Sequence, residues 1–345
     1  MGTSTRRPTT RSRRDESGVA LPMAALFMIA LLGMAALVID LGNGWRIRRS
    51  LIQATDSGAL AAAQEFVNNQ NGCTNGTASS YVNANEAAAV MTLCDPHVYS
   101  GGEQGRVTVS ADHNVQTWFS SVLGLGDFTV SSTTTALWGP PAAVTGLRPI
   151  GLCIDGSAAL ASIIGNPPTT DTLIRVSYNK DHPDDCGGTN IPGNWGTIDF
   201  DGGANSNADT QDWVVNGYDG EVSFANHSVM SCTGEPHCYG GDTGALSGVN
   251  NELVTLRNSG IFFTLPVFNF VENPGNNASM HLMGIIRVRL VDFVVNGPEA
   301  GRYFDLLVRP GLITGTCCGS GSGAGGNKVI AICGVDPAVF SACDP

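Results

Sequence analysis

The segment at residues 194–213, NWGTIDFDGGANSNADTQDW, places carboxylate and amide oxygens at mostly alternate positions among glycines. Hard oxygen donors in a flexible loop are the ligands that Ca²⁺ requires. The order is not that of an EF-hand, because two glycines directly follow Asp-x-Asp and no glutamate occupies the twelfth position. Asx turns select the same residue types. The sequence therefore predicts no cofactor, with calcium as the alternative, and its candidate ligands are Asp199, Asp201, Asn205, Asn207 and Asp209.

A second group of metal-binding residue types lies in CTGEPHCYGGD, residues 232–242. Thiolate and imidazole groups are zinc ligands, so Cys232, His237 and Cys238 raise the question of a zinc site. Their spacing is not a standard zinc pattern. A short Cys232–Cys238 disulfide loop is the favoured interpretation.

All ten cysteines lie after residue 70, and an even number is typical of disulfides in an oxidising compartment. We expect Cys73 to pair with Cys94 across a helical stretch. We expect the adjacent Cys317 and Cys318 to form two separate bridges rather than a vicinal disulfide, with Cys333 and Cys343 as partners. The other candidates for disulfides, besides Cys232 and Cys238, are Cys153 and Cys186.

Motifs of catalysis are missing from the sequence. There is no Gly-x-Ser-x-Gly nucleophile elbow, no phosphate-binding loop and no His-Glu-x-x-His, and the six histidines are scattered. We therefore expect that the protein is not an enzyme.

The longest apolar run extends from Gly18 to Ile39, 22 residues without a charge. As a helix it would measure roughly 33 Å, close to the ~30 Å hydrocarbon thickness of a bilayer. The run is longer than the ~7–15 apolar residues of a signal peptide. Pro22 lies near its start, where a missing N–H costs little, and Gly33 is among the small residues that suit helix packing in lipid. The run predicts a permanent membrane anchor rather than a cleaved signal or a buried core helix.

Charged and aromatic residues at the ends of this run predict its orientation. Five arginines precede it, including Arg13 and Arg14, and three follow it, Arg46, Arg48 and Arg49. The excess predicts a cytoplasmic N-terminus and an extracytoplasmic C-terminal part in the plasma membrane.

Two further residues mark the outer end of the span. Trp45 is expected in the outer interfacial belt. Asp40 is expected to be a solvated charge at the interface, with burial in a partner helix bundle as the alternative.

Since 27 of the 30 acidic residues follow residue 50, the exposed part is acidic, which argues against a nucleic-acid partner.

Periodicity predicts an α+β protein with a long transmembrane helix, a small α/β region and a β-rich, disulfide-containing extracytoplasmic domain. The expected divisions are 1–17, a basic segment; 18–41, the span; 42–139, a helical extension with the α/β region; and 140–345, the β-rich domain with a Gly/Ser loop at 319–326. The helix is expected to end near residue 68, a second helix to cover 79–93, and strands to cover 105–115, 127–138 and 281–295. Arg287 and Arg289 would share one face of the last strand.

Residues 16–63 resemble the N-terminal segment of the TadE/TadG-like proteins of the Flp-type (Tad) pilus-assembly system. The resemblance is carried by Gly18, the apolar span, and then Asp40, Gly42, Trp45, Arg46, Arg48, Arg49, Gln53, Ala54, Asp56, Ala59, Leu60 and Ala61–Ala63. It implies a single-pass envelope protein that serves pilus biogenesis and a pilin-like character of the small α/β region. Other pilus-assembly membrane proteins and the lipid bilayer are the implied partners of the helix. The fifth residue after Gly18 is Met23 and not the glutamate of processed prepilins, so an uncut anchor is expected.

The leading hypothesis is therefore a non-enzymatic structural or assembly component of a Tad pilus system that exposes a disulfide-containing head. The alternative is a membrane-anchored surface adhesin or calcium-stabilised binding module. A surface hydrolase would require a converging acid–base set that the sequence does not show.

Overall fold

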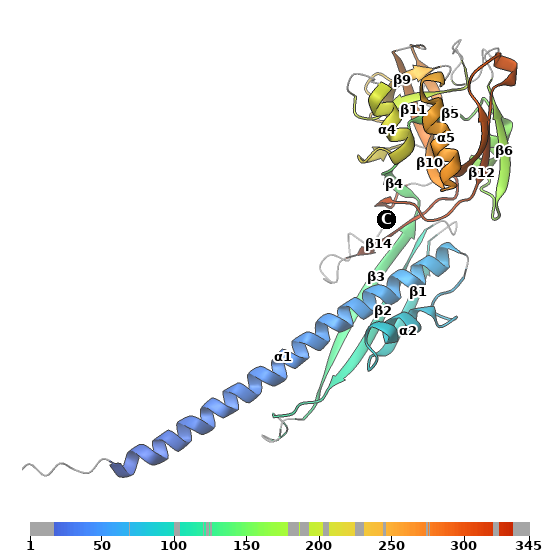
Figure 1. Cartoon of the computed structure of the whole chain (residues 1–345). Coiled ribbons are helices and arrows are strands. Elements are labelled where there is room, and N and C mark those ends of the chain that lie inside the picture. The colour runs from blue at the N-terminus through green and yellow to red at the C-terminus, as the bar shows by residue number, and fades with distance from the viewer. Residues whose placement is uncertain are drawn as a thin grey trace, which may run out of the picture.

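The computed structural model describes residues 17–68, 70–99, 104–119, 121, 124, 126–178, 186, 193–202, 207–224, 231–243, 246–273, 275, 277–319 and 324–333. A long helix, α1, leads into a small helix–sheet unit, and a larger β-rich head lies at the far end of that unit (Figure 1). The first half of α1 projects from the rest of the chain on its own. This arrangement confirms the predicted fold class.

Helix α1 covers Ser17–Val67, 51 residues with Pro22 inside, and is therefore about 77 Å long. It runs without interruption through the predicted span and its extension, and it ends where the asparagine-rich segment begins. Its two halves differ in burial. Side chains from Leu21 to Ile39 are exposed or half-buried, whereas Ile47, Leu51 and Ala54 lie in the core at helical spacing.

The second half of α1 packs on a four-stranded antiparallel sheet of order β1-β2-β3-β14, which together with helix α2 forms the helix–sheet unit. The elements are α2 (Thr77–Asn85), β1 (Val90–Val98), β2 (Gly105–Val115), β3 (Phe128–Gly139) and β14 (Val329–Cys333). Side chains of β2 alternate between buried and half-buried, as the period-2 pattern predicts. The core joins Leu51 and alanines of α1 to Val82, Val107 and Trp138.

The predicted helix over 79–93 is too long. Helix α2 ends at Asn85, and Val90 already begins the edge strand β1. The alanines at 87–89 suit a helix, but pairing with β2 overrides this propensity for residues 90–98.

The predicted boundary at residue 140 does not separate two continuous domains. Strand β14, from the far end of the chain, pairs with β3 and completes the sheet under α1, with Ile330 opposite Trp138. The Gly/Ser segment before it is described only at residues 319 and 324–326. The chain therefore leaves the helix–sheet unit after β3, builds the head and returns.

The head contains a seven-stranded sheet of order β10-β5-β7-β9-β11-β12-β6 and a three-stranded sheet of order β13-β4-β8. Its strands are β4 (Pro141–Val144), β5 (Ile150–Cys153), β6 (Thr172–Ser177), β7 (Trp195–Asp199), β8 (Val222–Ser223), β9 (Cys238–Thr243), β10 (Phe263–Glu272), β11 (Ala278–Val294), β12 (Tyr303–Val308) and β13 (Gly315–Cys317). The additional β10–β11 pairing closes β10, β5, β7, β9 and β11 into a ring. The 17-residue β11 pairs with three strands, which confirms its predicted central place.

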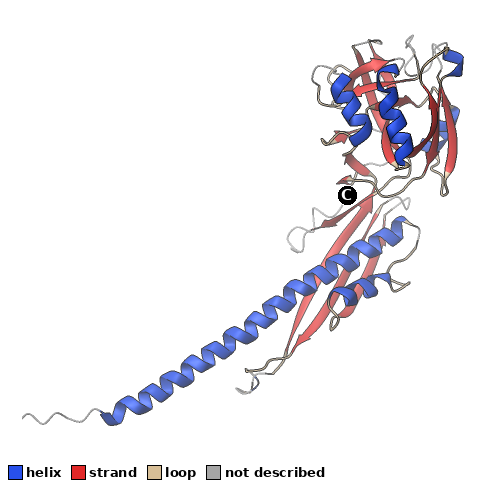
Figure 2. Cartoon of the chain, viewed as in Figure 1, coloured by secondary structure: helices blue, strands red, loops and turns tan. Residues whose placement is uncertain are grey.

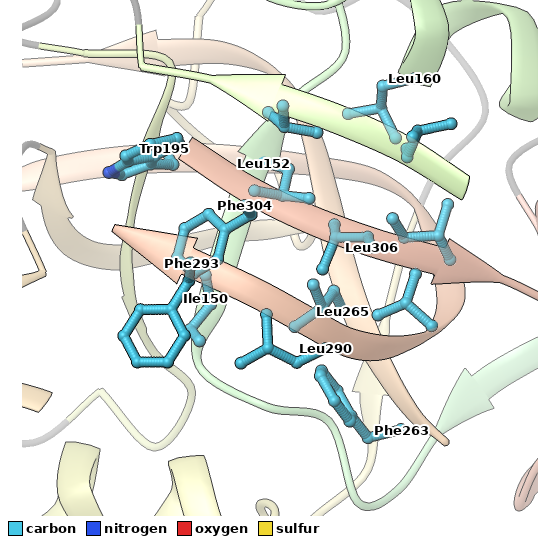
Figure 3. Packing of buried hydrophobic residues seen from close by; sticks show 14 of the residues in the cluster. Ile150, Leu152, Leu160, Trp195, Phe263, Leu265, Leu290, Phe293, Phe304 and Leu306 are labelled. Atoms are coloured by element: carbon cyan, nitrogen blue, oxygen red, sulfur yellow. The ribbon is translucent and has the colours of Figure 1, made fainter. Parts of the chain in front are cut away.

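Helices cover one face of this sheet, and they are α3 (Ala158–Gly165), α4 (Asn207–Asn216) and α5 (Asn250–Ser259). Figure 2 shows α4 and α5 lying across the strands. The core between helices and strands is built from large side chains, among them Trp195, Phe304 and Leu160 (Figure 3). A second core, around Phe268 and Met280, fills the other side of the sheet.

Disulfides join Cys73 to Cys94, Cys153 to Cys186, Cys232 to Cys238 and Cys317 to Cys318. The first and third pairs are those expected from the sequence. Separate bridges for Cys317 and Cys318 are wrong. Strand β13 ends at Cys317, so the alternation of a strand does not turn the two neighbouring side chains to opposite sides. Cys333 is also disulfide-bonded, and Cys343 lies outside the described residues.

Candidate functional site

The first half of α1 is the largest apolar surface among the described residues. Side chains from Leu21 to Val38 include eleven large apolar groups that are 47–77% exposed. The most apolar 18-residue window has a mean hydropathy of 2.4, and none of it is buried. An apolar surface of this extent marks a site of contact with lipid or with protein. Within the described residues, α1 is the one helix long and apolar enough to cross a membrane.

Gly33 lies on this exposed half, and a Cβ atom built there meets nothing within 4 Å. The residue is therefore not required for packing inside the chain. Gly18 lies in α1 near its first described residue, and Pro22 lies inside the helix. Small residues on a membrane helix allow close approach by another helix, and contact of Gly33 with a partner helix stays a prediction.

Asp40 stands at the point where α1 first contacts the sheet unit. It is only 7% exposed, and its two carboxylate oxygens accept hydrogen bonds from the backbone N–H groups of Trp118 and Phe119, with N···O distances of 3.1 and 3.2 Å. The expectation of a solvated charge at this position is wrong. The reason is that the turn between β2 and β3 covers the carboxylate with peptide N–H groups 78 and 79 residues further along the chain.

A second contact holds the same turn against the helix. A Cβ on Gly44 would lie 2.6 Å from Cζ of Phe128, so the glycine allows the ring to rest on the helix surface. Thr117 donates its backbone N–H to Asp127 across the turn at 3.0 Å. An open groove of about 660 Å³ lies beside these contacts, between α1 and β3, and is lined by Leu41, Gly42, Gly44, Trp45, Arg48, Phe128, Thr129, Val130 and Ser131.

Polar and aromatic groups surround this level of the helix. Trp45 is 64% exposed, and Arg46, Arg48 and Arg49 are exposed on the following turn. Arg46 donates to the side-chain oxygen of Asn43 at 3.2 Å. Arg13 and Arg14 lie outside the described residues. The described flank therefore has the composition of a membrane interface, with an aromatic ring and three cations directly after the apolar half.

The candidate calcium ligands do not form a cluster in the part of the chain that the structure describes. Asp199 ends β7 and is 7% exposed, and burial, followed by a hydrogen bond with Asp201, raises its pKa. Asp209 is exposed in the first turn of α4, while Asn205 and the side chain of Asn207 lie outside the described residues. No group of three His, Cys, Asp or Glu side chains suited to a metal ion occurs among the described residues. Calcium binding stays a prediction.

Cys232 and Cys238 are bonded to each other in a disulfide, so neither supplies the thiolate that the zinc interpretation of residues 232–242 requires. His237 Nδ1 instead lies 3.1 Å from the Ser223 hydroxyl. Burial raises the pKa of Asp242, and its Oδ1 atom is buried without a hydrogen-bond partner. This segment is therefore a disulfide-closed loop that leads into β9, which lies between β7 and β11 in the sheet.

Three arginines gather around one ring on the head. The guanidinium carbons of Arg287, Arg289 and Arg309 lie 4.8, 5.8 and 4.5 Å from the ring centroid of Phe262. Arg309 also pairs with Asp171. The predicted common face of Arg287 and Arg289 is confirmed, whereas Phe262 was missed because only the pairing of β10 with β11 brings it there.

The comparisons with known proteins concern the helix. Residues 18–65 match the family model described as "Putative Flp pilus-assembly TadE/G-like". The match covers α1 from the start of its apolar half to the end of its packed half, and it confirms the resemblance stated for this segment. No curated protein and no solved structure gives a significant match to the chain.

Proposed function

We propose that the protein is a non-enzymatic, membrane-anchored structural or assembly component of a Tad (Flp-type) pilus system. One observation carries the proposal: the segment that matches the pilus-assembly family is also the helix whose apolar first half has no buried residue among those that the structure describes. A family match supports the pilus association, and the uncovered half supports the anchor.

The proposed orientation has residues 1–17 in the cytoplasm and the helix–sheet unit and head on the extracytoplasmic side. It is supported by the arginines on both sides of the apolar half and by the disulfides of the chain, which form in oxidising compartments. In this orientation α1 acts as a rigid stalk, because its second half is locked on the sheet by Leu51 and its alanine neighbours.

The proposed mechanism is lateral packing of the membrane helix against other pilus-assembly membrane proteins, while the head is displayed outside. Gly33 is the position at which this packing is tested, since nothing in the described chain occupies the space beside it. A Leu side chain at this position would keep a partner helix away without disturbing the fold.

The experiment is detergent co-purification of the full chain from cells that carry the pilus system, comparing Gly33→Leu with wild type. Met34→Leu is the matched control, since Met34 is 57% exposed and the exchange keeps the residue's size and apolar character. We expect Gly33→Leu to lose most of the co-purified pilus-assembly proteins, and Met34→Leu to keep them. Equal recovery in all three would contradict helix packing at this face.

A further inference from the structure

The turn between β2 and β3 exposes two large aromatic side chains. Trp118 is 70% exposed and Phe119 is 44% exposed, although β2, which precedes them, ends at the buried Val115. In the described residues, Trp118 is the most exposed tryptophan, and Trp138 and Trp195 are buried. Within the described residues this neighbouring Trp and Phe pair, just after the end of β2, is not part of a hydrophobic core, so it is a candidate contact for an external partner.

Two contacts with α1 fix the position of the turn along the helix. The N–H groups of Trp118 and Phe119 bind Asp40, and Phe128 rests on Gly44. Figure 1 shows the β2–β3 hairpin running beside the second half of α1 and ending near the middle of the helix. The aromatic pair therefore lies at the level of Asp40, one residue after the apolar run ends at Ile39.

This level coincides with the surface of a bilayer. A span from Gly18 to Ile39 is roughly 33 Å long, and it fills the hydrocarbon layer, so that Asp40 and the bound turn meet the headgroup region. Trp and other amphipathic rings favour this region. The helix supplies Trp45 at nearly the same level, and Arg46, Arg48 and Arg49 lie just beyond it, where lipid phosphates are found.

We propose that Trp118 and Phe119 insert into the lipid interface on the head side of the membrane, so that the protein contacts the bilayer at two places, the helix and the β2–β3 turn. The inference rests on the membrane anchoring in the proposed function and adds a second contact to it. We infer lipid, rather than a protein, as the partner of the aromatic pair. The pair is held at the end of the apolar half of α1, and this half is itself long and apolar enough to lie in a bilayer. The second contact narrows the range of tilt of α1, since interfacial aromatic anchors set the tilt of a spanning helix and this pair lies to one side of it.

The experiment uses the full chain, with its disulfides intact, in phosphatidylcholine vesicles that carry bromine atoms on the upper part of the acyl chain. Bromine quenches only tryptophans that touch the lipid. The chain has five tryptophans, and of these Trp45 and Trp118 are the ones at the membrane level. We expect Trp118→Phe to remove about half of the lipid-dependent quenching, because it removes one of two lipid-facing indoles. Trp213→Phe, in the head, is the control and is expected to leave the quenched intensity unchanged.

A second variant tests the attachment of the turn. Asp40→Ala frees the N–H groups of Trp118 and Phe119, and we expect the Trp118 contribution to the quenching to fall while the helix stays inserted, as judged by resistance to alkaline extraction. If Trp118→Phe keeps the full wild-type quenching while the chain resists extraction, the turn does not touch lipid and the inference is wrong, although the anchor stands. Extraction of the wild-type chain at alkaline pH would instead overturn the anchor itself.

Discussion

Replacing Asp40 tests whether the β2–β3 turn is held on α1 by its carboxylate. In the structure this group accepts N–H bonds from Trp118 and Phe119 at 3.1 and 3.2 Å. A hydrogen bond to a charged acceptor contributes about 1.5–3 kcal/mol, and the exposure of the turn places the value here at the lower end. Two such bonds are lost, so we expect Asp40→Ala to lower the free energy of local opening of the turn by about 3 kcal/mol, equivalent to about 150-fold faster amide exchange.

The assay is hydrogen–deuterium exchange of the full chain in lipid nanodiscs, read by mass spectrometry on peptides that contain residues 116–119. Global stability is expected to change little, because the sheet and the core around Leu51 do not depend on the turn. Asp56→Ala is the matched control: this carboxylate also lies on α1 and accepts from Thr134 at 2.7 Å, but it is remote from the turn. Equal exchange of residues 116–119 in wild type and Asp40→Ala would refute the clamp.

Three further changes test the packing and the charges of the fold. Gly58→Ala and Gly42→Ala gain the same helix propensity, up to ~1 kcal/mol, but only Gly42 has open space around it. A Cβ at Gly58 would lie 2.7 Å from a methyl group of Val82 and 3.1 Å from the Ala78 carbonyl oxygen. We therefore expect Gly42→Ala to be more stable than Gly58→Ala by about 1–3 kcal/mol, measured by thermal unfolding in detergent. Asp242→Asn tests a half-buried carboxyl with one buried oxygen, whose pKa is raised from 3.8 by burial. The folded state binds this proton more tightly, so wild type loses stability as the pH rises through the folded pKa. We expect the variant to be more stable than wild type near neutral pH and equal to it below pH 3.8, and a constant difference at all pH values would contradict the assignment. Replacing Cys73 and Cys94 together by serine removes the disulfide that closes a loop of 21 residues, and we expect the free energy of unfolding in denaturant to fall by about 3 kcal/mol. If the variant differs from wild type only when the other disulfides are reduced as well, the result argues against this pair.

Helix α1 and strand β2 could be predicted from the sequence, because the spacing of apolar residues within each segment indicates the type of element. The apolar run and the spacing of Ile47, Leu51 and Ala54 predict one continuous helix, and the alternation in residues 105–115 predicts β2 with the same bounds. The break between α2 and β1 was missed, since alanines at 87–89 suit either state until pairing with β2 decides it.

Features that depend on contacts between distant residues were not accessible in this way. The burial of Asp40 arises from peptide N–H groups 78 and 79 residues away, and the return of β14 joins Ile330 to Trp138. Signals for both existed: an exposed Trp-Phe pair between two strands, and a short alternating strand after a glycine-rich segment. Neither signal specifies its partner, because register is set by packing in three dimensions.

The calcium prediction has a direct test of its own. Thermal unfolding of the full chain is compared with and without calcium, in wild type and in Asp199→Asn. A site that includes Asp199 would stabilise wild type in proportion to the logarithm of the calcium concentration above the Kd and would leave the variant unaffected. An identical response of both proteins would remove Asp199 from the ligands.

The central claim is that the uncovered half of α1 spans the membrane and holds the head on its outer side. It is tested by labelling intact and permeabilised spheroplasts with one antibody to the folded head and one to an epitope at the N-terminus, followed by alkaline extraction of the membranes. The account predicts that the head is labelled in intact spheroplasts, that the N-terminal epitope is labelled only after permeabilisation, and that the chain stays in the alkali-washed membrane. Labelling of the N-terminal epitope in intact spheroplasts, or release of the chain by alkali, would contradict it.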